Sequence, residues 1–405
     1  MSIRQAGKPH PIVYLILCIP FGVTSGYVSV TLGFLLAHAG VSVGAISALV
    51  AFGLLPQTWK AAWAPVVDTT LTSKQWYLIG AAVSALAMIA TGLFPVNAQG
   101  LQAITVLVFL FNVSISFLAM AAENLMAHST GLEEKGRAGG WYQAGNLGGY
   151  GVGGGLALWI AEHSTIGWLP GAAMGVLFLL CCAALFFVDE PSAEHRQTTY
   201  AHTLRDLIAD LWQTARSRAG YLALLICFLP IGSGAATNLW GAVASDWHAD
   251  ANTVALANGV LGGFISMAGC LIGGYLCDRM ERRFAYALFG IALAVVTLAM
   301  AAAARSATMF VVFTLAYNFV QGFNYASFSA VVLEAIGRGA AATKYNLYAS
   351  LSNIPIAYIG LADGWAHDHW GSMGFLLTDA LSGLVAVGVF FAIAAATRPR
   401  VAATA

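Results

Sequence analysis

The feature that most constrains this chain is a series of about twelve apolar stretches, each long enough to cross a lipid bilayer. About 20 apolar residues span the hydrocarbon core as an α-helix. Only 9% of the 405 residues are charged and 59% are hydrophobic, whereas soluble domains carry about 25% charged residues. The sequence therefore predicts an all-α membrane protein. The predicted spans are 12–37, 43–66, 76–95, 101–127, 138–161, 166–188, 219–244, 252–277, 284–304, 307–335, 343–364 and 372–396.

The distribution of basic residues predicts how these spans cross the membrane. Short cytoplasmic loops carry an excess of Lys and Arg. With both termini in the cytoplasm, 16 of the 18 basic residues fall on the cytoplasmic side, whereas Arg305 falls outside and Lys60 lies within a span. The first apolar stretch is too long for a cleaved signal sequence and is predicted to be a span. We expect a multi-pass protein of the bacterial inner membrane with both termini cytoplasmic.

The two halves of the chain repeat one another. Asp68 and Asp278, which end the second and eighth spans, are 210 residues apart, and Glu123 and Glu334, in the fourth and tenth spans, are 211 residues apart. A near-constant offset indicates internal duplication. Two six-helix halves related in this way are the architecture of the major facilitator class of transporters. The expected organisation is an N-terminal six-helix bundle, a cytoplasmic linker and a C-terminal six-helix bundle over residues 1–188, 189–218 and 219–405.

A charged motif follows the eighth span. The run 273–283 (Gly-Gly-Tyr-Leu-Cys-Asp-Arg-Met-Glu-Arg-Arg) resembles the major facilitator signature loop, although Glu281 replaces the usual glycine. In that loop an aspartate meets charges on a neighbouring helix, and breaking this contact lets the halves rock. The alternative is a plain cytoplasmic turn. The predicted conformational-switch residues are Asp278, Arg279, Arg282, Arg283 and, in a weaker first-half copy, Asp68.

Charged residues inside spans are the first candidates for a coupling mechanism, because they are costly to bury in a membrane. Lys60 and Glu123 are expected at similar depths in the second and fourth spans. A protonatable Glu123 whose pairing with Lys60 changes with conformation would couple solute movement to protons. The alternative is a static ion pair, or a lysine that reaches the membrane interface. Asp379, in the twelfth span, is a further candidate.

Polar and aromatic side chains are concentrated in particular spans. Lipid-facing helices do not need so many hydrogen-bonding groups, and aromatic rings supply an apolar face with a polar tip. We therefore predict a cavity for a sizeable polar solute with sugar or ring faces, the alternative being ordinary hydrogen bonding between helices. The predicted lining residues are Tyr27, Tyr142, Gln143, Asn146, Asn238, Trp240, Tyr317, Gln321, Asn324, Tyr325, Tyr345 and Asn353.

Other classes of function are disfavoured by the same sequence. A net charge of zero argues against a nucleic-acid partner. The six cysteines lie in apolar segments without metal-ligand spacing, and His367-Asp368-His369 falls in a short outer turn, so neither a metal site nor an enzyme is expected. The glycine run 148–155 lacks the Gly-Lys-Ser/Thr of a phosphate loop, and its Gly151 and Gly155 have the spacing of close-packed membrane helices. We expect a monomer without cofactors whose partners are lipid, a small-molecule solute and protons.

Several runs carry a resemblance to a more specific family. The run 60–68 (Lys-Ala-Ala-Trp-Ala-Pro-Val-Val-Asp) resembles the Lys-x-x-Trp-x-Pro-x-x-Asp of the AmpG-type muropeptide permeases. Further similar runs occur around the fifth and eleventh spans, at 133–136, 154–159, 342–345, 349–352 and 364–365. The resemblance implies a proton-coupled symporter that imports its solute from the periplasm by alternating access. It carries over to Lys60, Asp68 and Glu123, which stand where the family has a lysine, an aspartate and an acidic residue.

The same resemblance bears on the solute. Leu147 stands where muropeptide permeases carry a basic residue, and Thr69 stands where they carry arginine. Related permeases import siderophores or carry acetyl-CoA, but a single buried cation provides poorly for the phosphates of CoA. A muropeptide-like or siderophore-like solute is therefore expected. A drug or metabolite exporter of the same fold, and a membrane sensor that does not transport, are the alternatives.

Overall fold

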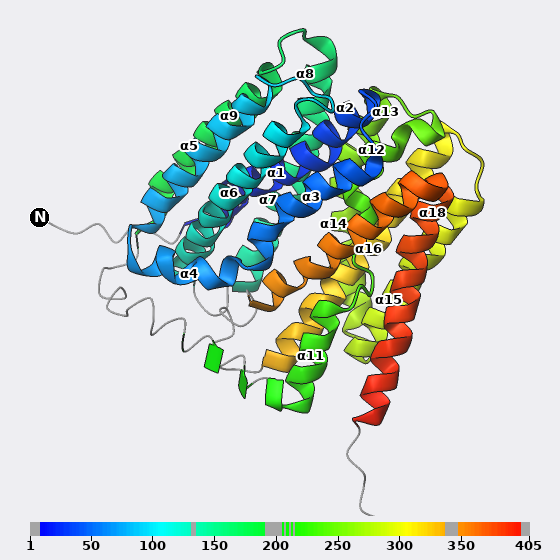
Figure 1. Ribbon diagram of the computed structural model, residues 1–405. Coiled ribbons are helices and arrows are strands. Elements are labelled where there is room, and N and C mark those ends of the chain that lie inside the picture. The colour runs from blue at the N-terminus through cyan, green and yellow to red at the C-terminus, as the bar shows by residue number, and fades with distance from the viewer. Residues whose placement is uncertain are drawn as a thin grey trace, which may run out of the picture.

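The computed structural model describes residues 9–130, 135–190, 215–336 and 347–397, together with five positions within 205–213. Every regular element in these ranges is a helix, and the helices lie side by side in an elongated bundle (Figure 1). Six helical segments of the described residues are both long and apolar enough to cross a membrane. The other spans are shorter, broken or richer in polar and small residues. The predicted all-α membrane fold of two six-helix halves is confirmed.

The first half contains six spans, most of which are assembled from consecutive helical pieces. The first span bends through a short π-helical stretch, and the second is interrupted at Trp59, whose φ of −118° and ψ of 12° are not helical. In chain order the pieces are α1 (Ile12–Gly26), η1 (Tyr27–Leu32), α2 (Gly33–His38); α3 (Val43–Thr58), α4 (Lys60–Thr69); α5 (Ser73–Thr91); α6 (Leu101–Ser129); α7 (Lys135–Gly151), η2 (Val152–Leu156), α8 (Ala157–His163); and α9 (Leu169–Cys182), η3 (Ala183–Phe187).

The second half repeats this arrangement. Its eleventh and twelfth spans form one helical element that turns sharply at Gly371, where φ is 64°. In chain order the pieces are α11 (Arg218–Phe228), η5 (Ala235–Asn238), α12 (Trp240–Val243), η6 (Ala244–Trp247); α13 (Ala251–Val254), η7 (Ala255–Leu261), α14 (Gly262–Cys277); α15 (Arg282–Ala302); α16 (Ala307–Ile336); and α18 (Asn353–Ala396).

The seventh span differs from the continuous helix predicted at 219–244. Helix α11 ends at Phe228, and the chain continues in non-helical conformation until η5 begins at Ala235. The interruption contains Pro230, which lacks a backbone N–H, as well as Gly232 and Gly234, whose φ values are 57° and 72°. Such positive φ values favour glycine. The seventh span is therefore a broken helix.

The turn between the eleventh and twelfth spans is shorter than the interval 365–371 that the predicted spans leave for it. The sequence His367-Asp368-His369, expected in a short outer turn, belongs to α18, and the turn comes at Gly371. Asp368 is consequently held on a helix, where it accepts a hydrogen bond from the Gly44 N–H near the start of α3.

The two halves are joined at this same end. The pieces η1 and α2 of the first span pack against α12, and a Cβ at Gly33 would lie 3.7 Å from the backbone nitrogen of Ala242. The predicted close packing at Gly151 and Gly155 is directed across the interface, because a Cβ at either position would lie 3.0 Å from a backbone oxygen of η7, that of Gly259 or Ala255. Glycine allows these two backbones to approach closely.

At the opposite end, α4 and α11 each pack mainly within their own half. The main contacts of α4 are with α3, α5 and α6, whereas those of α11 are with α16 and α18. Figure 1 shows α4 and α11 at this end on separate halves of the bundle. The basic loops predict that it faces the cytoplasm. The structure is therefore closed at the end predicted to be outer.

Candidate functional site

An ion pair lies inside the first half. Helix α4 begins at Lys60, directly after the break at Trp59, and its Nζ atom is 3.1 Å from Oε1 of Glu123 on α6. Both side chains are largely buried, with exposed fractions of 11% and 19%. The sequence left open whether these residues meet, and the structure brings them together. Cys18 and Tyr142 lie close enough to act on the pair electrostatically.

A second buried acidic group lies in the second half, around Asp379. Its carboxylate accepts hydrogen bonds from the hydroxyls of Tyr317 at 3.2 Å and Thr297 at 3.3 Å. The carboxyl of Asp363 acts electrostatically on the same group. Sequence reasoning did not single out Asp363, although it lies within the predicted eleventh span. In the structure it is a buried residue of α18, before the turn at Gly371.

A set of polar side chains connects the two halves near the middle of the bundle. Ser29 on the first span donates a hydrogen bond of 3.0 Å to Oδ1 of Asn238 in the broken seventh span. The neighbouring Thr237 donates to Gln321 at 2.6 Å, and the amide of Gln321 donates to the hydroxyl of Tyr325 at 3.3 Å. These bonds link the first, seventh and tenth spans.

Two tyrosines extend this set. The ring of Tyr325 is 46% exposed although its hydroxyl is hydrogen-bonded to Gln321. Tyr150, on α7 of the first half, lies close enough to Tyr325 and to Ser29 to interact with both, and its hydroxyl is buried. We define the central polar group as Ser29, Tyr150, Thr237, Asn238, Gln321 and Tyr325. The combination of amides, hydroxyls and aromatic faces at an interface between halves suits a ring-bearing polar solute.

The other predicted cavity residues are used within single halves. Tyr27 is hydrogen-bonded to Thr91 at 2.8 Å, and Trp240 is buried edge-to-face against Tyr317 and Phe375. The amides at Asn324 and Asn353 donate to backbone oxygens within their own half. Tyr142 is buried. Gln143 is exposed and accepts a 3.3 Å hydrogen bond from Asn146, so these two predicted cavity residues pair with each other on α7. Tyr345 lies outside the described residues.

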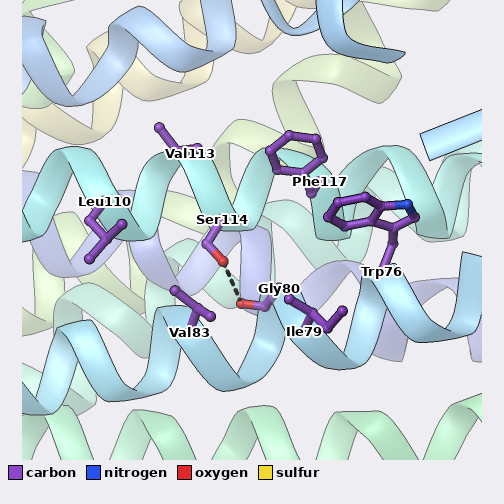
Figure 2. A pocket seen from close by; sticks show the side chains of 8 residues that line it. All are labelled: Trp76, Ile79, Gly80, Val83, Leu110, Val113, Ser114 and Phe117. Carbon is purple, nitrogen blue, oxygen red and sulfur yellow. Dashed lines mark hydrogen bonds between the residues drawn. The ribbon is translucent and has the colours of Figure 1, made fainter. Parts of the chain in front are cut away.

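An apolar groove on the outside of the first half has a different character. Figure 2 shows it between α5 and α6, where the side chains of Trp76 and Phe117 stack with ring centroids 4.8 Å apart. The hydroxyl of Ser114 is used in a hydrogen bond of 3.2 Å to the backbone oxygen of Gly80. Ile79 and Leu110 are more than 40% exposed beside it. This groove suits a lipid chain and offers no polar contact to a solute.

Residues 13–360 match the model of the Major Facilitator Superfamily. The chain belongs to this superfamily. Two anhydromuropeptide permeases of Escherichia coli, from strains K12 and O157:H7, are each 25% identical to it over 414 residues, which cover 95% of this chain and 80% of the relative.

Solved structures of the superfamily share its fold. A D-xylose–proton symporter superposes with a TM-score of 0.70 at 13% identity, covering 94% of this chain and 96% of that protein. The nucleoside transporter NupG superposes with a TM-score of 0.72 at 12% identity, covering 94% and 98%. The E. coli xylose transporter XylE, in a partially occluded inward-open conformation, gives 0.68 at 12% identity and covers 94% and 96%. These proteins are transporters, and this facilitator is a multi-pass membrane protein of the transporter class.

The signature loop of this facilitator joins α14 to α15. Asp278 follows the last residue of α14, and the guanidinium of Arg279 lies 3.4 Å from the centre of the Tyr275 ring while donating to the Tyr275 backbone oxygen at 3.1 Å. Glu281, the residue in place of the usual glycine, accepts a 2.8 Å hydrogen bond from the Phe284 N–H and thereby caps α15. Arg282 and Arg283 open that helix. The switch role of these residues remains a prediction, and the side chain of Asp68 lies outside the described residues.

A further carboxylate acts at the same end of the first half. Glu190 accepts hydrogen bonds from the backbone N–H groups of Ser73 at 2.7 Å and Lys74 at 3.0 Å. It therefore binds the start of α5, where a negative charge is favoured by the helix dipole. The residue lies at the start of the predicted linker, most of which is outside the described residues.

At the outer end, Asp246 forms a small charged cluster. Its carboxylate is 2.7 Å from Nε2 of His367 and also accepts a hydrogen bond from Ser372. Burial raises the pKa of Asp246, but the hydrogen bonds from His367 and Ser372 and the nearby positive charge of Arg305 outweigh it, so the pKa lies below its ordinary value. The cluster ties the end of the seventh span to the turn between the eleventh and twelfth.

Proposed function

We propose that this facilitator is a secondary transporter that imports a sizeable, polar, sugar-bearing solute of the muropeptide type across the inner membrane, coupled to protons. The observation that carries the proposal is the hydrogen bond between Ser29 and Asn238, which spans the interface between the halves. In alternating access the two halves rock about a site at the repeat interface. The central polar group occupies such an interface and joins residues from the first, fifth, seventh and tenth spans.

The chemistry of the central polar group supports a sugar-like solute. Amide and hydroxyl groups can exchange their present hydrogen bonds for those of sugar hydroxyls, and Tyr150 and Tyr325 offer aromatic faces to a ring. The one cation placed inside a predicted span, Lys60, is occupied by Glu123. Leu147 makes the corresponding part of α7 neutral. A neutral or weakly charged sugar moiety fits this environment better than a multiply phosphorylated solute.

The relatives support the same choice. The anhydromuropeptide permeases match 95% of this chain, whereas the solved sugar and nucleoside transporters are too distant in sequence to support more than the fold. No feature of the described residues specifically favours a siderophore. The direction of transport, import, rests on the same relatives, and the candidate coupling residues within the spans are Lys60, Glu123 and Asp379.

Uptake in right-side-out membrane vesicles tests the proposal. Labelled anhydromuropeptide and a labelled ferric siderophore are offered separately under an imposed inward proton gradient, with and without an uncoupler. We expect uncoupler-sensitive accumulation of the anhydromuropeptide, lost in Asn238→Ala and Tyr325→Ala. Tyr221→Ala is the matched control, because Tyr221 is 40% exposed on α11, outside the central polar group.

The other outcomes each exclude part of the proposal. Accumulation of the siderophore alone would show that the solute is a siderophore and not a muropeptide. Accumulation in inside-out vesicles alone would make the protein an exporter. If all the variants behave alike, the central polar group is not the solute site.

A further inference from the structure

A pair of carboxylic acids is enclosed in the second half, and none of the described residues supplies it with a cation. Asp363 has no exposed surface, and Asp379 is 8% exposed. Both oxygens of Asp363 lack a hydrogen-bond partner, whereas Asp379 accepts bonds from Tyr317 and Thr297. The two carboxyls lie near enough to repel one another when both are ionised, and Tyr317 interacts with both.

The break in the seventh span lies beside this pair. A small cavity next to Asp379 is lined by Pro230, Gly232 and Ser233 of the interrupted segment, and by apolar residues and glycines of α15 and α18. The backbone of Ala236, in the short helix that follows the break, also interacts with Asp379. Unwound stretches of membrane helices occur where a cavity or ion site needs backbone polar groups. The break therefore supplies both polar backbone and space at the carboxyls.

The surroundings determine the charge that the pair can carry. Within the described part of the chain, the only ionisable group besides the two carboxyls that acts on the pair is Tyr317 on α16. The other polar groups beside Asp379 are the hydroxyl of Thr297 on α15 and the backbone of Ala236 in the seventh span. An ionised carboxylate without a cation or hydrogen-bond donor is too costly to bury. At least one of the two neighbouring carboxyls is therefore expected to be protonated.

Glu123 has the opposite environment. Its carboxylate is paired with Lys60 at 3.1 Å, which compensates its charge. A carboxylate paired with a lysine is stabilised in its ionised form, so it binds a proton less readily during the cycle than a carboxyl that no described cation contacts. The two acidic sites of this protein therefore differ in the role that their surroundings allow.

The helix that carries Asp363 also closes the outer end. The next residue, Gly364, packs against Ser47 of α3, and Asp368 accepts a 3.0 Å hydrogen bond from the Gly44 N–H at the start of the same helix. Ionisation of the pair would require water to reach Asp363, and hence a movement of α18. That movement would disturb its contacts with α3.

We propose that Asp363 and Asp379 form the proton-binding dyad of this transporter, and that the dyad must hold a proton for the outer end to close. The inference rests on the proposed function, because it names the coupling site of that transport. It predicts that the dyad couples protons to solute movement, whereas the Lys60–Glu123 pair holds the first half together.

Transport by Asp363→Asn and Asp379→Asn tests the dyad, with the membrane potential clamped at zero. A gradient of one pH unit supplies about 1.4 kcal/mol per proton, which is a tenfold accumulation of anhydromuropeptide at equilibrium. We expect each variant to lose this accumulation while still exchanging external for internal solute, since exchange needs no net proton movement. The matched control is Asp250→Asn, because Asp250 is a helix-capping carboxylate outside the dyad.

The outcomes separate this inference from the proposed function. Normal accumulation in both dyad variants, or uncoupling by Glu123→Gln alone, would overturn the dyad and leave the function standing. Accumulation driven by sodium at uniform pH, and lost in the same variants, would replace the proton by a sodium ion. Failure of wild type in both accumulation and exchange would refute the proposed solute.

A measurement without solute then tests whether the dyad holds a proton. Infrared spectroscopy of the purified protein at neutral pH detects the C=O stretch of protonated carboxyls. We expect such a band in wild type and in Asp250→Asn, and its loss or reduction in Asp363→Asn and Asp379→Asn. Absence of the band in the folded wild-type protein would overturn the inference.

Discussion

Replacing Asp368 by alanine removes a contact by which the two halves hold the outer end shut. Its Oδ1 atom accepts a 3.0 Å hydrogen bond from the Gly44 N–H, at the N-terminus of α3 in the other half. A hydrogen bond to a charged group contributes roughly 1.5–3 kcal/mol, and a carboxylate at an exposed helix N-terminus roughly 0.3–1 kcal/mol. Because Asp368 is exposed, we take a value of about 1 kcal/mol. This corresponds to about a fivefold change in the ratio of outer-closed to outer-open protein.

Distances between two spin labels measure that ratio. The labels are placed at Ala39 in the first half and His369 in the second, both of which are exposed at the outer end. Double electron–electron resonance then reports the populations of short and long distances in a background without native cysteines. We expect Asp368→Ala to raise the long-distance population about fivefold relative to the short one.

Asp250→Ala is the matched control. Asp250 caps α13 by accepting a 2.9 Å hydrogen bond from the Thr253 N–H, so it is a carboxylate at a helix N-terminus within one half. Its loss is expected to leave the distance distribution unchanged. An unchanged distribution in Asp368→Ala, or an equal shift in both variants, would refute the argument that the Asp368 contact closes the outer end.

Three further results follow from the structure. The lowered pKa of Asp246 contributes stability that is fully present above its unfolded pKa near 4 and is lost as pH falls through the lower folded pKa. The Tm of wild type should therefore fall more in acid than the Tm of Asp246→Asn. Parallel curves of Tm against pH would contradict this. Glu123→Gln leaves Lys60 buried without its counter-charge and should lower the stability by up to about 3–5 kcal/mol, measured as a lower Tm. The double variant Lys60→Met/Glu123→Gln should recover the Tm. A Tm that does not recover would argue against the ion pair. Gly153→Ala places a Cβ 2.1 Å from a backbone oxygen of the first span, and the overpacking should lower the stability by about 1–3 kcal/mol and with it the Tm. At Gly148 a Cβ meets no atom within 4 Å, so Gly148→Ala should leave the Tm unchanged. Equal Tm values in the two variants would refute the packing argument.

Hydropathy and charge predicted the membrane fold because they are local properties of the chain. An apolar run of about 20 residues must cross the membrane wherever its neighbours lie. The duplicated positions of Asp68 and Asp278 indicated two related halves before any contact was known. Lys60 and Glu123 stood out for the same reason, since a charge inside a span is costly whatever its partner.

Helix breaks were only partly visible in the sequence. Pro230, Gly232 and Gly234 are local signals for the interruption of the seventh span, but the apolar character of the whole segment favoured one continuous helix. The turn at Gly371 shows the same limit, because span lengths alone fix the ends of helices to within a few residues. As a result, His367, Asp368 and His369 were expected in the outer turn, whereas the structure places them in α18.

What the sequence by itself determined is the set of spans, their duplication and the presence of charged and polar side chains within them. Only the tertiary structure decided which of these meet. Ser29 and Asn238 are 209 residues apart in the chain, and Lys60 and Glu123 are 63 apart, yet each pair is hydrogen-bonded. The physical reason is that the direction in which a helix turns its polar face depends on the helices packed around it. The same packing, with the break in the seventh span, placed Asp363 and Asp379 together, with no cation from the described part of the chain.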